Sequence, residues 1–276
     1  MADNEKGPDL APDEQKKARE EKDLNAHITY EVIRQAGCDE LDRSSSALAW
    51  SGLAAGLSMG FSFFVEALLL SHLPDARWTP LITKFGYSIG FLLVILGSQQ
   101  LFTENTLTAV IPLLAEKTRK TFYNTARLWT AVLVANLVGA FIFAAVMNID
   151  SLFNPELVKA FEHVAVHAFK HDAIQTLVLG IFAGWLIAMM VWMLPAAGEM
   201  DTVIIIIVAY LVGLGAFPHI IAGAVDVFYA GLHGHAPWKQ VVFSYILPTL
   251  VGNSIGGVAL VSGLAHAQVT SGGDAR

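Results

Sequence analysis

The stretch Gly213-Leu-Gly-Ala-Phe-Pro-His-Ile-Ile-Ala-Gly-Ala-Val-Asp226 lies inside an apolar run, residues 203–230, that is long enough to cross a bilayer. Pro218 and His219 stand side by side near the middle of this run. Proline interrupts a helix because it lacks an N–H group and clashes with the preceding turn. An ionisable side chain at membrane depth is costly, so it marks a candidate functional site. The stretch therefore predicts an interrupted membrane helix with a histidine at the break.

The composition of the whole chain is that of a membrane protein. Of the 276 residues, 54% are hydrophobic and only 15% are charged, whereas soluble domains carry about 25% charged residues. Six apolar runs approach or exceed the length of a spanning helix, and the second does so only when residues 106–114 are added to it. These runs are residues 47–70, 85–101, 128–147, 174–194, 203–230 and 241–264.

The segments outside the predicted channel domain, residues 47–266, are short. Residues 1–27 are highly charged and are expected to form a disordered tail. Residues 28–46 predict an amphipathic helix at the membrane interface, and residues 267–276 form a C-terminal tail. Lys and Arg gather in the N-terminal segment and in the Lys117–Arg127 loop, so the positive-inside rule predicts that both termini are cytoplasmic.

Three ordered similarities predict an internal repeat. The first and fourth runs share a Gly-x-x-Ala-Gly pattern, and the third and sixth share an Asn followed three residues later by a Gly. The second and fifth runs are aligned through Phe102 and Phe217, each close to a polar or helix-breaking residue. Because the unit has three spans, the halves (about 47–147 and 174–266) must have opposite orientation, with the interrupted spans meeting near the midplane. The matching stretches are Gly52–Gly56 with Gly180–Gly184, Asn136–Ala140 with Asn253–Gly257, and Ser98–Thr108 with Gly213–Gly223.

The interrupted ends suit an anion. Pro218 fits the first turn of a new half-helix, and Thr103 and Asn105 are suitable N-terminal caps for the other one. Both half-helices would then direct free N–H groups and a positive dipole end at the centre.

These motifs resemble the formate/nitrite transporter family. Leu101-Phe-Thr103, Phe217-x-His219 and Gly252-Asn253-x-Ile-Gly-Gly257 match its two broken-span motifs and its sixth-span motif. The resemblance covers about residues 47–265, and it is closest to an inner-membrane branch that carries Leu-Phe-Thr-Glu-Asn-Thr. It implies an aquaporin-like, all-helical protomer in the inner (plasma) membrane, a homopentamer with one pore per protomer, and passage of small monovalent anions or their acids.

The resemblance also implies a substrate pathway. Its central histidine would be His219, its sixth-span asparagine Asn253, and its extracellular lysine Lys170. Its apolar constrictions would come from Leu101, Phe102 and Phe217. This sequence departs from the family pattern in three places: Pro218 replaces a Glu before the histidine, Gly223 replaces an Asn, and Glu104 stands where formate channels have a small or neutral residue.

The chemistry of the pathway centres on His219. An anion that enters a dry constriction gains affinity for a proton because desolvation disfavours its charged form. A histidine can supply that proton directly or through water. Thr103 and Asn253 hydrogen-bond the histidine or the substrate, or else cap and tie helices. Glu104 either faces the pore and titrates or pairs elsewhere, and Lys170 either attracts anions or is an ordinary surface residue.

Other functions remain open from the sequence. Glu104 motivates a pore for a neutral or cationic solute such as ammonium, and the divergent loop motivates a non-transporting scaffold or sensor. Glu66 and Asp226 are interpreted as solvated residues near the membrane edge. The helical face of His163, His167 and His171 is interpreted as a wet surface rather than as a metal site. We expect no enzyme activity, cofactor, metal or nucleic-acid partner, because the sequence contains no signature for them.

Overall fold

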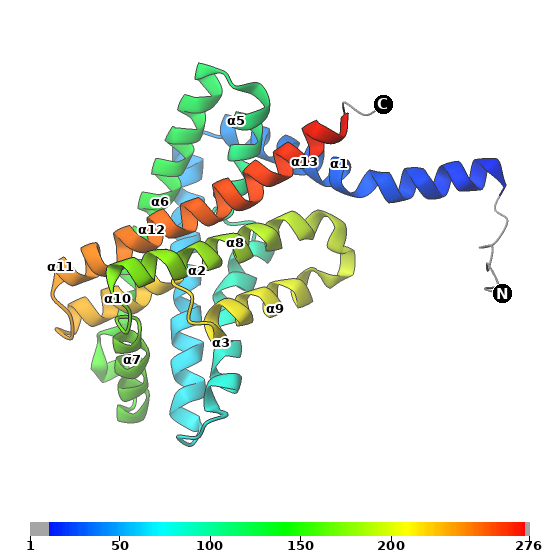
Figure 1. Ribbon diagram of the computed structural model, residues 1–276. Coiled ribbons are helices and arrows are strands. Elements are labelled where there is room, and N and C mark those ends of the chain that lie inside the picture. The colour runs from blue at the N-terminus through cyan, green and yellow to red at the C-terminus, as the bar shows by residue number, and fades with distance from the viewer. Residues whose placement is uncertain (1–10, 274–276) are drawn as a thin grey trace, which may run out of the picture.

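The computed structural model describes residues 11–273, and every regular element in that range is helical. The helices are α1 (Pro12–Asp42), α2 (Ser45–His72), α3 (Thr79–Leu96), α4 (Asn105–Thr108), α5 (Val110–Glu116), α6 (Arg119–Met147), α7 (Pro155–His167), α8 (Ala173–Ala197), α9 (Asp201–Leu214), α10 (Ala222–Leu232), α11 (Trp238–Gln240), α12 (Leu247–Ser254) and α13 (Leu264–Gly273) (Figure 1). Short 3-10 turns cover Asp150–Leu152 and Gly198–Met200, and π-helical segments cover Val241–Ile246 and Ile255–Gly263.

The two expected tails lie partly outside the described residues. Residues 1–10 of the N-terminal tail and residues 274–276 of the C-terminal tail are not described. Helix α1 already begins at Pro12 and continues through the segment expected at the membrane interface.

Side-chain caps fix where several helices begin. The hydroxyl oxygens of Ser44 and Thr118 accept hydrogen bonds from backbone N–H groups in the first turns of α2 and α6. Asn154 does the same for α7, and Pro155 follows it in the first helical turn. Asp172 and Gln175 form a reciprocal capping box at the start of α8. Each cap satisfies an N–H group that has no partner within the helix.

Five helical stretches are long and apolar enough to cross a membrane: Ser45–His72, Thr79–Leu96, Arg119–Met147, Ala173–Leu214 and Trp238–Ser271. The fourth combines α8 and α9, which the 3-10 turn joins into a hairpin (Figure 1). Helix α10 is apolar but shorter. The chain is therefore an all-helical membrane protein.

Helix pairs approach closely where glycines face backbone. Helix α2 packs on α6 and α3, while α8 packs on α12 and α9. A Cβ atom on Gly56 would lie 2.1 Å from the carbonyl oxygen of Asn136, and one on Gly184 would lie 2.2 Å from that of Asn253. Both positions require glycine because any side chain would force the helices apart.

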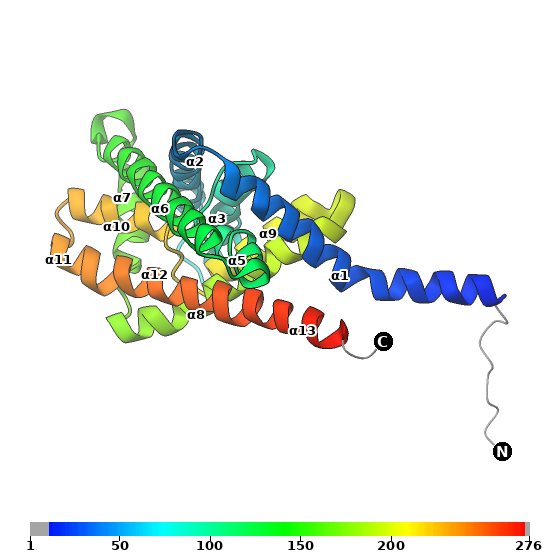
Figure 2. The same cartoon turned by 90° about the horizontal axis from the view of Figure 1, so that it is seen from above.

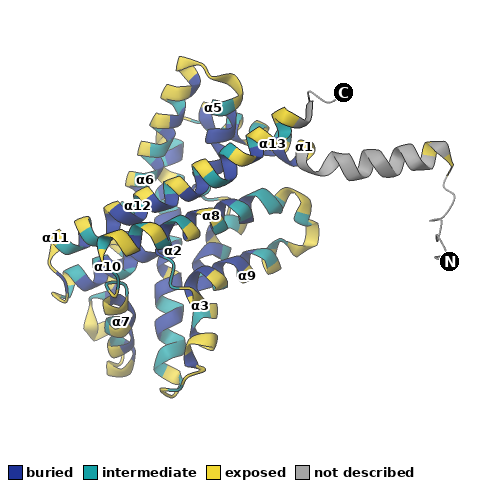
Figure 3. Cartoon of the chain, viewed as in Figure 1, coloured by how far each residue is buried: buried dark blue, intermediate teal, exposed yellow. Residues whose placement is uncertain are grey.

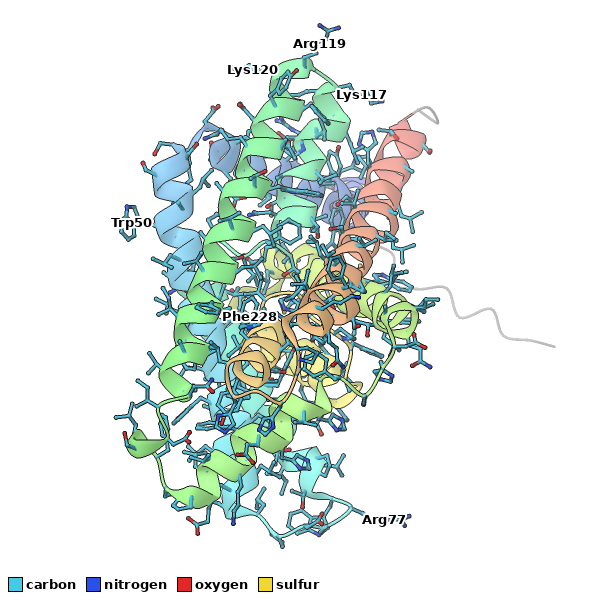
Figure 4. The ribbon with its side chains drawn as sticks, turned by 90° about the vertical axis from the view of Figure 1, so that its left-hand side faces the viewer. Trp50, Arg77, Lys117, Arg119, Lys120 and Phe228 are labelled. Atoms are coloured by element: carbon cyan, nitrogen blue, oxygen red, sulfur yellow. The ribbon has the colours of Figure 1, made fainter. Side chains whose placement is uncertain are left out.

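The outer surface is apolar, as a lipid-facing surface should be. Exposed residues cover the periphery of the helices (Figure 3) and include large apolar side chains such as Trp50, which is 72% exposed and points outward in Figure 4. Figure 4 also places Lys117, Arg119 and Lys120 at one end of the molecule and Arg77 at the opposite end. Seen from above, the C-terminal part of α1 lies against the helical body and its N-terminal part extends away from it (Figure 2). Helix α1 also contacts α13, where Tyr30 Oη is 2.6 Å from His266 Nδ1.

Candidate functional site

His219 is buried in the segment between α9 and α10, with 1% of its surface exposed. The backbone N–H of Ala222 donates to His219 Nδ1 at 3.2 Å, and Thr103 Oγ1 lies 2.9 Å from His219 Nε2. Because Nδ1 accepts a hydrogen bond, the proton of the neutral ring is assigned to Nε2, which donates to Thr103. The threonine hydroxyl then keeps its own proton available for another acceptor.

Thr103 reaches His219 from the segment between α3 and α4. The two connecting segments begin with the same backbone geometry. Ser98 and Ala216, neither of which is glycine, have left-handed φ angles of 50° and 48°. The N–H of Gln99 donates to Val94, and the N–H of Phe217 donates to Val212. The backbone therefore pairs Phe217 with Gln99, and the alignment of Phe102 with Phe217 is wrong by three residues.

Two buried asparagines hold these segments in equivalent ways. The Oδ1 atom of Asn136 accepts from the N–H of Phe102 at 2.9 Å, and its amide donates to the carbonyls of Gly52 and Gln100. The Oδ1 atom of Asn253 accepts from the N–H of Ile220 at 2.8 Å. Its amide donates to the carbonyls of Gly180 and Pro218. Each asparagine thus satisfies backbone groups that no helix could satisfy in an apolar interior.

The three residues expected at apolar constrictions have different surroundings. Leu101 is fully buried, and Phe102 packs edge-to-face on Trp129 with a centroid distance of 5.3 Å. Phe217 stacks on Phe182 at 5.5 Å and contributes to a cavity wall. His219 itself meets the ring of Phe91 edge-to-face at 5.0 Å. The buried histidine ring thus has an aromatic neighbour, Phe91, in addition to its two hydrogen bonds.

A cavity of about 560 Å³ is lined by residues that include Phe217, Pro218 and Gly223, which are close to His219 in the chain. It lies among the ends of α2, α3, α7 and α9, on the Arg77 side of the molecule. A Cβ atom on Gly223 would lie 1.8 Å from Tyr245 Oη, so the tyrosine ring occupies the space beside this glycine. Pro218 lines the cavity, whereas its neighbour His219 is not one of the lining residues.

Charged groups of both signs line this cavity. Glu66 is only 5% exposed and forms an ion pair with Lys84, and Asp226 contributes a further carboxylate. Glu66 is therefore not the solvated residue that the sequence suggested. Lys170 also lines the cavity, as does His167. Burial, followed by the positive charges of Lys170 and Lys84, lowers the pKa of His167 to about 4, and burial lowers the pKa of Lys170 as well.

Glu104 directly follows Thr103 and caps the N-terminus of α4, and its carbonyl accepts hydrogen bonds from the N–H groups of Leu107 and Thr108. The charge of Glu40 on α1 acts on the Glu104 carboxyl. Glu40 accepts hydrogen bonds from Gln100 Nε2 at 3.1 Å and from Thr108 Oγ1 at 2.9 Å. Helix α1 thus places a second carboxylate against the segment that carries Thr103 and Glu104.

The sequence interpretation missed several polar contacts near these segments. Trp129 Nε1 donates to the carbonyl of Asn105, and Ser262 Oγ donates to the carbonyl of Thr106. Gln100 connects Glu40 to Asn105. A single tryptophan or serine in an apolar run carries no signal that distinguishes such a contact from ordinary packing.

Comparison with known proteins agrees with this geometry. The formate/nitrite transporter family model matches residues 27–267. Inner membrane protein YfdC of Escherichia coli (strain K12) is 39% identical over 244 residues, which are 88% of this chain and 79% of that protein. Formate channel BtFdhC of Bacillus thuringiensis is 24% identical over 239 residues, which are 84% of this chain and 90% of that protein.

Two solved structures share the fold. One is a pentameric formate channel with formate bound, which has a TM-score of 0.72 and 22% identity and covers 82% of this chain and 98% of its own. The other is an FNT family ion channel, with a TM-score of 0.76, 19% identity, and coverage of 87% and 98%. The family-model match and the 39% identical relative confirm the resemblance carried by the sequence motifs, and the chain therefore belongs to the formate/nitrite transporter family of membrane channels.

Proposed function

We propose that the protein passes a small monovalent anion, or its weak acid, with proton exchange at His219. The hydrogen bond between Thr103 and His219 is the observation that carries this proposal. The shared proton would lie between the segments that connect α3 to α4 and α9 to α10, near a cavity with charged side chains in its wall and beside the ring of Phe91. An anion that leaves the cavity loses its hydration there, so its affinity for a proton rises at the position where a proton is available.

The proposed pathway assigns a role to each candidate residue. The Thr103 hydroxyl gives its proton to the substrate and takes the proton of His219 Nε2, and cavity water returns a proton to the ring in the same exchange, so that the ring stays neutral. Asn253 fixes the backbone on either side of the histidine through Ile220 and Pro218. Leu101, Phe102 and Phe217 exclude hydrated ions, and Lys170 attracts the anion into the cavity.

We further propose that the fold is a 3+3 inverted repeat with interrupted second and fifth spans. Support comes from the matched hydrogen bonds of Asn136 and Asn253 and from the matched left-handed residues Ser98 and Ala216. A repeat of three spans places the two segments on opposite sides of the midplane.

The proposed assembly is a homopentamer in the inner membrane, with both termini in the cytoplasm. The pentameric solved structure and the inner-membrane relative support the first two points. The cluster of Lys117, Arg119 and Lys120 at one end of the molecule supports the orientation (Figure 4).

A second candidate function is passage of a neutral or cationic small solute such as ammonium. The carboxylates favour it, because Glu66 and Asp226 line the cavity and Glu104 follows Thr103 directly. An ionised carboxylate beside the pathway would repel an anion and attract a cation.

Flux into liposomes that contain the purified protein separates these functions. Formate, nitrite, lactate and ammonium are compared between pH 5 and pH 8. We expect uptake of one or more of the anions to rise as the pH falls, and His219→Asn to flatten that dependence. His72→Asn, an exposed residue at the end of α2, serves as the control and should keep the wild-type profile. A wild-type pH profile in His219→Asn would exclude the proton-donor role.

The carboxylate at Glu104 is tested in the same assay. Glu104→Gln should raise anion flux relative to ammonium flux, because it removes a negative charge from the pathway. Ammonium uptake by the wild type without anion uptake would favour the second candidate.

A further inference from the structure

A cluster of three metal-ligating side chains lies away from the proposed pathway. Glu162 is on α7, and His233 and His235 are in the turn that follows α10. One ligand atom from each of them lies within 4.8 Å of the others. His233 Nε2 is 3.4 Å from Glu162 Oε1, and His235 Nε2 is 4.0 Å from the same oxygen. We propose that these three residues bind Zn²⁺ or a similar divalent transition-metal ion.

The turn after α10 brings both histidines to one side. Gly234, between them, has a left-handed φ of +83°, which a residue with a side chain rarely adopts. The N–H groups of His235 and Ala236 both donate to the carbonyl of Ala230, which closes the end of the helix. This closed turn places the rings of His233 and His235 against the carboxylate of Glu162.

Asn148 fixes which nitrogen of His233 is free to bind a metal. Its amide Nδ2 donates to the carbonyl of Ala144 at 2.9 Å, which leaves its Oδ1 facing His233 Nδ1 at 3.0 Å. That oxygen can only accept, so the proton of the neutral ring is assigned to Nδ1. The lone pair of Nε2 then points at Glu162. A histidine that donates through its other nitrogen to a fixed oxygen is the usual arrangement of a metal ligand.

This arrangement leaves two acceptors face to face. A carboxylate oxygen and an imidazole lone pair at 3.4 Å repel each other unless a proton or a cation lies between them. The ring of His233 cannot turn away easily, because it is stacked between Tyr229 at 5.3 Å and His235 at 5.0 Å. A cation that binds both atoms removes the repulsion.

The donor set and its spacing indicate which cation fits. Two imidazole nitrogens and one carboxylate oxygen form a ligand set that Zn²⁺ uses, with a fourth position left for water. Bonds of about 2.0–2.1 Å in a tetrahedral site separate neighbouring ligand atoms by about 3.3 Å. The observed 3.4 Å matches this spacing, and the 4.0 Å contact needs only a small rotation of His235, whose side chain is exposed.

The bound ion would link α7 to the C-terminal end of α10. Helix α7 lines the cavity through His163 and His167, and α10 begins three residues after His219. The site is distinct from the His163–His167–His171 face, whose rings turn toward the cavity.

Zn²⁺ binding to the full-length protein in detergent tests the proposal. The protein carries an affinity tag without histidines, and Zn²⁺ affinity is measured by competition with a chromophoric chelator. We expect one high-affinity Zn²⁺ per chain. Glu162→Gln and His235→Asn should each weaken binding about tenfold or more, because each removes a ligand. The control His163→Asn, adjacent to Glu162 on α7, should bind as the wild type does.

Folding of each variant is checked by its thermal unfolding in excess EDTA, where all four proteins should behave alike. In the wild type, added Zn²⁺ should raise the unfolding temperature, since a ligand that binds only the folded state stabilises it. That increase should be lost in His235→Asn. Equal Zn²⁺ affinity in all four proteins would overturn the proposal, as would loss of binding in His163→Asn alone.

Discussion

Thr103 Oγ1 lies 2.9 Å from His219 Nε2, although the two residues are 116 positions apart. The N–H of Ala222 occupies the other ring nitrogen, so the proton shared with Thr103 is the one that the ring can release. Without Thr103, this buried N–H group would have no acceptor in an apolar surrounding. The pair therefore links the chemistry of the histidine to the position of the segment between α3 and α4.

Replacing Thr103 tests this link. Thr103→Val keeps the shape of the side chain but leaves the Nε2–H group unpaired, at a cost of about 1–3 kcal/mol. We expect the proton-dependent flux of the variant to fall about tenfold, since each 1.4 kcal/mol in a barrier is a factor of ten. Thr103→Ser keeps the hydroxyl and should retain most of the flux. Liposome uptake at low pH measures both, and equal flux in the two variants would contradict a relay through the hydroxyl.

Two glycines on α8 should respond very differently to the same change. A Cβ atom on Gly184 would lie 2.2 Å from the carbonyl oxygen of Asn253, whereas the nearest atom to a Cβ on Gly180 is 3.4 Å away. Gly184→Ala should therefore destabilise the protein by about 1–3 kcal/mol through overpacking, and Gly180→Ala should have little effect. Thermal unfolding in detergent measures the difference. Similar unfolding temperatures for the two variants would show that α8 and α12 can separate at low cost.

Replacing either of the two buried asparagines, Asn136 or Asn253, should lower the stability of the protein by a similar amount. Asn136→Ala and Asn253→Ala each leave one N–H and two carbonyl groups without their partner. Each buried group left unpaired costs about 1–3 kcal/mol, so both variants should unfold at clearly lower temperatures. Thr130→Ala on α6 removes an exposed hydroxyl that bonds within its own helix and should change little. If either asparagine variant unfolded at the same temperature as Thr130→Ala, the hydrogen bonds of that asparagine would not be stabilising the connecting segment.

Glu40 should make the attachment of α1 depend on pH. Burial raises the pKa of Glu40 despite its hydrogen bonds to Gln100 and Thr108. In a detached α1 the same carboxyl has its ordinary pKa, so it loses its proton at lower pH than in the docked helix. Docking is therefore strongest at acidic pH and weakens as the pH rises above the ordinary range of a glutamate. Hydrogen exchange of residues 27–42, corrected for the intrinsic effect of pH, measures this trend.

Variants on the same helix provide the comparison. Glu40→Gln should remove the pH dependence of exchange. Glu31 is hydrogen-bonded to Arg34, which lowers the pKa of Glu31 to about 2, so this carboxyl stays ionised at every pH tested. Glu31→Gln should leave the trend unchanged. If exchange in Glu40→Gln kept the wild-type slope, another group would control docking.

Patterns along the chain were sufficient for the membrane class and for the family, although five helical stretches rather than six are long and apolar enough to cross a membrane. The Pro218–His219 pair is unusual in an apolar run, whereas Gly56 and Gly184 carried weight only as part of three ordered similarities, because glycine is common in membrane helices. The register between the two interrupted segments was not predictable, because it depends on the left-handed backbone at Ser98 and Ala216, and neither residue type favours that conformation. Aligning Phe102 with Phe217, because both are aromatic, gave a register that differs by three residues from the register of the backbone hydrogen bonds.

Contacts between distant segments were also beyond the sequence. The burial of Glu66 depends on Lys84, which only the packing of α2 on α3 brings within reach. In the same way, Glu162 meets His233 and His235 only because α7 folds back onto α10. A residue pattern predicts which side chains share a face of one helix. These clusters depend instead on how two helices are positioned relative to each other.

The distribution of the asparagine hydrogen bonds has a consequence for biosynthesis. Asn136 binds groups within residues 52–102, and Asn253 binds groups within residues 180–220. The segment between α3 and α4, and the segment between α9 and α10, can therefore each take shape as soon as the helices that carry these groups have left the ribosome and entered the lipid. The contact between Thr103 and His219 has to wait until the C-terminal part of the chain has inserted and docked. A nascent chain would thus lack the contact between Thr103 and His219 until its synthesis is almost complete.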